Sequence, residues 1–128
     1  MEELLLNMPK SVKIGALTNA CVGYGKAVLK VNNNVIEMFS SVHGADDVPA
    51  PKPFGDGLLL CCQEMGLDPA ECVYVGDSPT DAKAAEEAGM PSIGVLWGSN
   101  SEERLSKAPF LHLCSTISEL REILPQKE

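Results

Sequence analysis

Short apolar runs alternate with amphipathic segments along the chain. Each apolar run is bounded by proline, glycine or polar residues, which is the pattern of a buried strand. These runs predict strands over residues 12–17, 39–43, 72–75, 92–96 and 110–114. The first follows Pro9 and ends at Thr18-Asn19, and the third runs into Gly76-Asp77.

Helical periodicity fills the intervals between the predicted strands. After Asp56, apolar residues fall at 58, 61, 62 and 65, and Gly66 follows where a C-terminal cap is favoured. Helices are predicted over residues 22–31, 56–65, 79–88 and 118–124. The Asn32-Asn33-Asn34 run is expected to end the first of them, and the proline- and glycine-rich segment 44–55 is expected to be a loop.

Strands separated by helices predict an α/β fold, a Rossmann-like three-layer sandwich with a mainly parallel sheet. The 128 residues fit one domain, spanning 1–128. Ligands of such sheets collect at the carboxyl ends of the strands. Thr18, Asp46-Asp47 and Asp77 each follow a predicted strand, so these polar groups are expected to share one rim.

Composition excludes several classes of partner. The hydrophobic fraction is 45% and the charged fraction 22%, as in ordinary globular proteins. A formal net charge of −8 argues against binding to nucleic acid or to anionic membranes. No apolar run is long enough to span a bilayer, and the acidic start is unlike a signal peptide. The five cysteines form no C-x-x-C pair, which favours reduced thiols and a cytoplasmic location.

The segment Gly76-Asp77-Ser78-Pro79-Thr80-Asp81 carries the strongest chemical signal. It places one carboxylate at a strand end and a second in the first turn of the following helix. Two such carboxylates suit Mg²⁺, which takes oxygen ligands and bridges to phosphate. The alternative is structural: Asp77 would cap the helix and Asp81 would complement its dipole.

Two further elements carry weaker signals. Lys52 lies between Pro51 and Pro53, so a stiff backbone would present its ammonium to a phosphoryl oxygen. The alternative is an exposed loop lysine. Thr18-Asn19 offers a hydroxyl and an amide to an anionic oxygen, although helix capping is the better explanation of Thr18 taken alone.

Together, in this order, the three elements resemble the second, third and fourth motifs of the haloacid dehalogenase-like (HAD) superfamily. The segment A-E-E-A-G-M-P-S-I-G-V-L-W-G, residues 85–98, is similar to the phosphoglycolate phosphatase branch. The resemblance implies that Thr18 and Lys52 are catalytic and, with Asn19, hold the phosphoryl group. It also implies that Asp77 and Asp81 bind Mg²⁺, and that the substrate is a small phosphorylated metabolite.

The first motif of that family, D-x-D-x-T after a strand, does not occur in the sequence. The resemblance implies that this motif supplies the nucleophile, which forms an aspartyl-phosphate, and a metal ligand, so Mg²⁺ binding is expected to be weak. Met1–Leu4 resembles the helix before the second motif. The resemblance therefore also implies that the mobile cap domain and the central first strand of the sheet are absent from the chain. The two flanking strands are expected to pair directly, to accept a strand from another chain, or to leave a poorly folded fragment. Exposed edges favour self-association.

The sequence therefore predicts a partial HAD-like phosphatase core, a Mg²⁺-dependent phosphate monoester hydrolase that is inactive as an isolated chain. The alternative is a non-catalytic HAD-like binding or interaction module. Dehalogenation is disfavoured, because members that cleave carbon–halogen bonds do not need the acid at position 77. A phosphoacceptor receiver domain is rejected, because receivers place their acid pair at the first strand and their lysine last.

Overall fold

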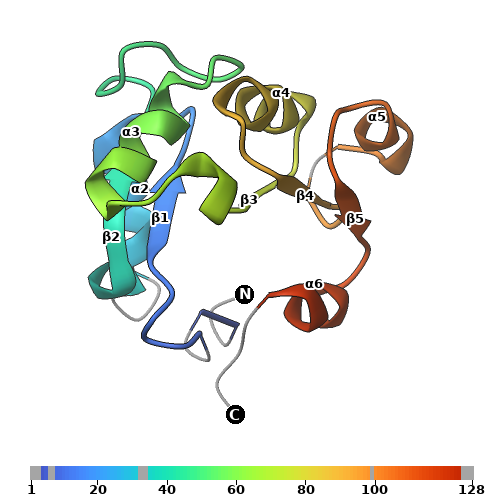
Figure 1. Ribbon diagram of the computed structural model, residues 1–128, viewed down its shortest axis with the longest axis horizontal. Coiled ribbons are helices and arrows are strands. Elements are labelled where there is room, and N and C mark those ends of the chain that lie inside the picture. The colour runs from blue at the N-terminus through green and yellow to red at the C-terminus, as the bar shows by residue number, and fades with distance from the viewer. Residues whose placement is uncertain (1–3, 6–7, 32–34, 99, 125–128) are drawn as a thin grey trace.

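The computed structural model describes residues 4–5, 8–31, 35–98 and 100–124 (Figure 1). The Asn32-Asn33-Asn34 run and most of the Met1–Leu4 segment lie outside these residues. The strands are β1 (Ile14–Leu17), β2 (Phe39–His43), β3 (Tyr74–Gly76), β4 (Ser92–Val95) and β5 (His112–Cys114). The helices are α2 (Val22–Val31), α3 (Asp56–Met65), α4 (Pro79–Ala88), α5 (Glu102–Ser106) and α6 (Ile117–Ile123), with two 3₁₀ turns at Val35–Met38 and Pro69–Glu71.

Every predicted strand and helix is present, with ends that differ by at most two residues. The α/β class and the parallel pairing are confirmed. The short helix α5 and the two 3₁₀ turns were not predicted, because each is too short to produce a periodic pattern. Glycine ends α3 and α4 as expected: Gly66 and Gly89 both adopt the left-handed conformation, with φ of 69° and 75°.

The described strands form two separate parallel sheets. One has the order β1-β2 and the other the order β3-β4-β5. Direct pairing of β1 with β3, one of the outcomes expected from the sequence, does not occur among the described residues. The run at 12–17 was predicted as a buried strand, yet no residue of β1 is fully buried, whereas every residue of β4 is. The difference follows from position, because β4 has a neighbour on both sides and β1 has only β2.

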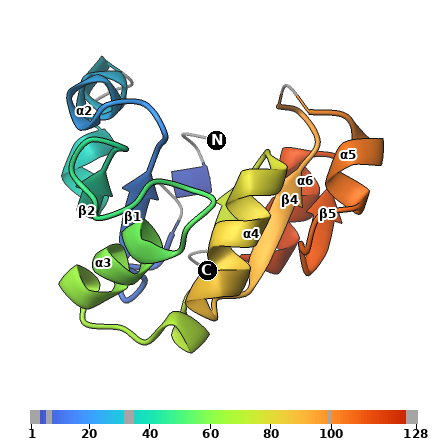
Figure 2. The same ribbon diagram turned by 90° about the horizontal axis from the view of Figure 1, so that it is seen from above.

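Helices α3 and α4 hold the two sheets together on one face. They lie side by side across the space between the sheets (Figures 1 and 2). Their contact is apolar and built from small or flexible side chains, namely Leu58, Cys62, Ala84, Ala85, Ala88 and Met90, with Leu17 of β1 and Tyr74 of β3 packed against it. Because one cluster receives a residue from each sheet, burial of apolar area couples the two halves.

A second apolar cluster covers the opposite face of the β3-β4-β5 sheet. Leu4, 1% exposed, packs with Leu120 of α6 and with strand residues Ile93, Val95 and Cys114. Val75 joins this cluster, whereas its neighbour Tyr74 joins the other, as the alternation of a strand requires. No helix in the described part of the chain has the length and apolar character to cross a membrane.

The α3–α4 contact generates a stability prediction. A Cβ atom on Gly55, just before α3, would lie 2.9 Å from the Ala88 nitrogen and 3.0 Å from the Ala84 carbonyl oxygen. Both atoms are backbone and cannot move aside cheaply. Gly55→Ala is expected to lower the free energy of unfolding by about 1–3 kcal/mol, the usual cost of overpacking, measured by urea denaturation.

Gly23→Ala is the matched control for that substitution. Gly23 lies in α2, and a Cβ atom there would meet nothing within 4 Å. This variant is expected to gain up to about 1 kcal/mol from helix propensity. Equal effects of the two substitutions would contradict tight α3–α4 packing at Gly55.

Candidate functional site

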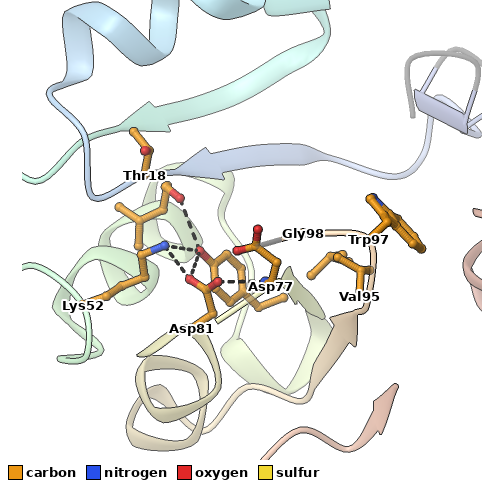
Figure 3. Close-up of a pocket in the computed structure, with 11 residues that line it drawn as sticks. Thr18, Lys52, Asp77, Asp81, Val95, Trp97 and Gly98 are labelled. Carbon is orange, nitrogen blue, oxygen red and sulfur yellow. Dashed lines mark hydrogen bonds and ion pairs between the residues drawn. The ribbon is translucent and has the colours of Figure 1, made fainter. Parts of the chain in front are cut away.

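A cavity of about 320 Å³ lies between the two sheets, at the carboxyl ends of their strands. Both sheets contribute to its wall, so residues far apart in the sequence meet there (Figure 3). It is lined by Leu17, Thr18, Lys52, Tyr74, Val75, Gly76, Asp77, Asp81, Val95, Trp97 and Gly98. The structure thus brings together four of the five predicted site residues.

Asp81 is the most heavily hydrogen-bonded side chain of this cavity. It is 4% exposed. Its Oδ1 accepts from Lys52 Nζ at 2.5 Å and lies 3.2 Å from the Tyr74 hydroxyl. Its Oδ2 accepts from the Asp77 and Ser78 backbone N–H groups and from the Ser78 hydroxyl. Burial raises the pKa of Asp81, but Lys52 and these donors outweigh it, and the net pKa lies below the ordinary value.

Lys52 is not an exposed loop lysine. Its side chain is 9% exposed and pairs with Asp81, and its Nζ also donates to the Tyr74 hydroxyl at 2.9 Å. The same ammonium lies 5.5 Å from the centroid of the Tyr74 ring, a cation–π distance. A buried ammonium with these partners is held in one place, pointing toward the centre of the cavity (Figure 3).

Asp77 differs from Asp81 in being free to bind. It follows β3, and its side chain has no hydrogen-bond or ion-pair partner among the described residues; only its backbone is engaged, its N–H by Asp81 Oδ2 at 3.0 Å and its carbonyl oxygen by Asn100 at 2.9 Å. The alternative in which Asp77 caps α4 is wrong, because Ser78 is the N-cap residue. The absence of a side chain at Gly98 matters here, since a Cβ atom would collide with the Asp77 carboxylate.

Thr18 and Asn19 separate in the structure. Thr18 lines the cavity at the end of β1, and its Oγ1 accepts the Ala20 backbone N–H at 3.1 Å. That bond closes a local turn and leaves the hydroxyl proton free for another acceptor. Asn19 is exposed and does not line the cavity. The roles assigned to both residues stay predictions.

A divalent cation would find an incomplete set of ligands. The described residues contain no cluster of three His, Cys, Asp or Glu side chains able to hold a metal ion. Asp77 alone offers an open carboxylate, while both oxygens of Asp81 already accept hydrogen bonds. Mg²⁺ commonly uses one or two carboxylates plus waters and phosphate oxygens, so Asp77 fits as one ligand of a shared site.

Asp46 and Asp47 follow β2 at the same end of the parallel β1-β2 sheet as Thr18, as expected, but neither acid lines the cavity with Thr18 and Asp77. Asp46 Oδ1 accepts the Val22 N–H at 2.7 Å and so satisfies the first turn of α2 from a distant loop. Asp47 Oδ1 accepts the Gly44 N–H at 2.7 Å. Both carboxylates are used to fold the loop back, as short polar side chains often are.

Asp47 also belongs to a separate cluster around His43, on β2. His43 Nδ1 lies 2.8 Å from Asp47 Oδ2, and Nε2 lies 2.7 Å from Glu64 Oε1 on α3. Ser41 donates to the same Glu64 oxygen at 2.6 Å. Lys26 of α2 completes the charged lining of this second hollow, whose volume is about 440 Å³.

Tyr74 is the residue of the main cavity that motif reasoning missed. Its hydroxyl reaches Lys52, Asp81 and the Leu17 carbonyl oxygen, at 2.9, 3.2 and 3.3 Å. The only signal in the sequence is an aromatic residue two positions before the strand-ending Gly76. Trp97, also missed, is 41% exposed and points away from Asp77 (Figure 3).

Comparison with known proteins identifies the family. The model of the haloacid dehalogenase-like hydrolase family matches residues 1–95. The phosphoglycolate phosphatase of Escherichia coli K12 is 38% identical over 96 residues, 75% of this chain, and that of Salmonella paratyphi A is 35% identical over 95 residues. The chain spans only 38% and 37% of those two relatives.

Solved structures agree over nearly the whole chain. A protein from Lactobacillus delbrueckii assigned as a phosphoglycolate phosphatase superposes with a TM-score of 0.85 at 25% identity, covering 97% of this chain and 52% of that one. A HAD-superfamily hydrolase of subfamily IA from Geobacter sulfurreducens gives a TM-score of 0.76 at 29% identity, covering 95% and 57%. The match covers nearly all of the chain, so it includes both sheets.

The chain therefore belongs to the haloacid dehalogenase-like hydrolase family, whose model covers most of its length. Within that family it falls in the phosphoglycolate phosphatase-like branch, as the curated relatives and the Lactobacillus structure indicate.

The His43 cluster generates a prediction about pH. Burial lowers the pKa of His43. Hydrogen bonds and charge attraction to Glu64 and Asp47 raise the pKa by more than burial lowers it, so the net pKa lies above 6.5. A histidine whose pKa is raised on folding stabilises fully below its unfolded value and loses that contribution as the pH rises through its folded value. His43→Gln is expected to destabilise by about 0.5–1 kcal/mol more at pH 6 than at pH 8.5, measured by urea unfolding.

His112→Gln is the control, because exposed His112 has no side-chain partner among the described residues. Its effect on stability should not differ between the two pH values. A pH-independent loss in His43→Gln would mean that the imidazole contributes packing rather than charge.

Proposed function

We propose that the chain is the part of a phosphatase core that holds phosphate and metal, and that it hydrolyses phosphate monoesters only when a further segment supplies the nucleophile. The observation that carries this proposal is one cavity that combines the buried ammonium of Lys52, the open carboxylate of Asp77 and the Thr18 hydroxyl. Relatives that are phosphoglycolate phosphatases support it, although the chain spans less than two fifths of their length.

Each residue has a distinct task in this proposal. Thr18 donates its hydroxyl to a phosphoryl oxygen, and exposed Asn19 would need to turn inward to assist. Lys52 neutralises charge that develops on the transferring group, without reorganising, because Asp81 and Tyr74 already hold its ammonium. Asp77 provides one carboxylate to Mg²⁺, which when bound would offset phosphate charge. Asp81 acts through Lys52 and the Asp77 backbone rather than as a direct ligand.

The proposal extends to partners and location. A complementing chain that places a strand between β1 and β3, or self-association at these open edges, would complete the sheet, and a small phosphorylated metabolite would be the substrate. All five cysteines are free thiols, which supports a cytoplasmic location.

A second candidate is a non-catalytic HAD-like module, and one observation favours it. Every oxygen of Asp81 and the ammonium of Lys52 are engaged with each other, with Tyr74 or with backbone donors. In that case the role of Lys52 and Asp81 is structural: they connect the loop that carries Lys52 with β3 and α4. The two candidates differ in whether completion of the sheet produces turnover.

Turnover of p-nitrophenyl phosphate with Mg²⁺ tests the proposal. The isolated chain is expected to be inactive, and a peptide that carries an apolar strand followed by D-x-D-x-T is expected to restore Mg²⁺-dependent hydrolysis. Asp77→Asn should then reduce the restored rate by at least about 100-fold, because it removes the open metal ligand.

Glu86→Gln is the matched control, since it neutralises an exposed carboxylate of α4 that does not line the cavity. It should leave the restored rate unchanged. Restored turnover that survives in Asp77→Asn would overturn the role of Asp77, and a saturated peptide complex without turnover would establish the non-catalytic candidate.

A further inference from the structure

The peptide groups at the end of β1 and within β3 show which backbone atoms face the gap between the sheets. The Thr18 N–H donates to the His43 carbonyl oxygen, on the β2 side. Because a trans peptide is planar, the Leu17 carbonyl of the same unit points the opposite way, into the gap. The Tyr74 N–H donates to Pro91 on the β4 side, so the next residue, Val75, turns its own N–H and C=O toward the gap.

Leu17 and Val75 both line the cavity, so these backbone groups look toward one another across it. No backbone hydrogen bond joins β1 to β3 in the described part of the chain. The cavity therefore has the edges of two parallel strands as its walls. A strand running parallel to both could pair with each of them.

One side chain already occupies part of this space. The Tyr74 hydroxyl lies 3.3 Å from the Leu17 carbonyl oxygen, so β3 reaches β1 through a side chain rather than through its backbone. The hydroxyl has one proton to give, and Lys52 donates to its lone pair. Two acceptors lie within its reach, Asp81 Oδ1 at 3.2 Å and the Leu17 carbonyl oxygen at 3.3 Å, and Lys52 also supplies Asp81 Oδ1 at 2.5 Å. The gap-facing Leu17 carbonyl accepts from no backbone N–H in the described part of the chain, so the Tyr74 hydroxyl is the donor beside it.

The protonation state of Tyr74 agrees with this role. Burial raises its pKa well above the ordinary value, and the negative charge of Asp81 raises it further. The hydroxyl thus keeps its proton throughout the neutral range and remains a donor. Tyr74 also shares the α3–α4 cluster with Leu17, so its ring is held where the hydroxyl reaches β1.

We propose that Tyr74 is a latch across the split sheet: its hydroxyl occupies the Leu17 carbonyl, and it must release that oxygen when an extended segment of a second polypeptide pairs with β1 and β3. This inference rests on the proposed function, because the incoming segment is the one that would supply the nucleophile. The latch makes Tyr74 a positioning residue for Lys52 and, at the same time, a competitor of the completing strand.

Tyr74→Phe removes the hydroxyl and keeps the ring in place. The probe is the synthetic peptide with an apolar strand followed by D-x-D-x-T, and its affinity is measured by isothermal titration calorimetry. Loss of a competing hydrogen bond is expected to tighten binding roughly two- to tenfold. Equal or weaker binding by Tyr74→Phe would overturn the competition. Tyr24→Phe, the same change at the other tyrosine, which is 63% exposed on α2, should leave the affinity unchanged.

Amide hydrogen exchange of the unliganded protein tests the latch independently of the peptide. Without the hydroxyl, exchange is expected to accelerate several-fold at Thr18 and Tyr74, whose N–H groups donate to His43 and Pro91 beside the gap, while exchange within α4 stays the same. Unchanged exchange at both residues would overturn the latch, even if the peptide binds. If exchange accelerates but the protein binds no peptide, the Tyr74–Leu17 hydrogen bond is supported. The competition of Tyr74 with a strand is then refuted, and so is the part of the proposed function in which a strand completes the sheet.

Discussion

A buried carboxylate in need of partners organises this molecule. Asp81 lies in the first turn of α4, where burial alone would favour its neutral form. It is instead surrounded by donors from the end of β3, from the N-cap of α4 and from the loop that carries Lys52. One carboxylate thus joins these three segments. The loop from Gly44 onward, with little regular structure of its own, is anchored to the β3–α4 half by it.

The same contact lies at the place where the sheet is interrupted. On one face, the two halves are joined by apolar packing of α3 on α4, and near the strand ends by the group formed by Lys52, Asp81 and Tyr74. Apolar packing is indifferent to direction, whereas hydrogen bonds to a charge fix geometry. The apolar packing of α3 on α4 therefore holds the two halves together, and the Lys52, Asp81 and Tyr74 group fixes how they are aligned. The two interactions together maintain the shape of the cavity.

Local pattern was sufficient to predict the elements, and it failed where distant residues decide the outcome. Residues 56–65 carry their own periodicity and glycine cap, so α3 was predictable in full. The carboxylate of Asp46 could not be placed, because its partner, the N–H of Val22, is brought near only by the pairing of β1 with β2. Tyr74 was missed for a similar reason: an aromatic residue in a strand usually packs, and its hydroxyl gains a structural partner only because β1 and β3 lie unpaired on either side of the cavity. Spacing identified Asp77 and Asp81 as a pair but could not show that one is open and the other occupied.

The cluster that contains Leu4 has a consequence for how the protein is made. Leu4 is buried against Leu120 and Cys114, which emerge from the ribosome long after it. During synthesis Leu4 must therefore wait, exposed, while β1, β2 and α3 can already pack among themselves. The β3-β4-β5 half acquires its second face only when α6 is complete. The β1-β2 half can therefore fold before the β3-β4-β5 half is complete. In that interval Leu4 and its cluster partners expose apolar surface to which chaperones could bind.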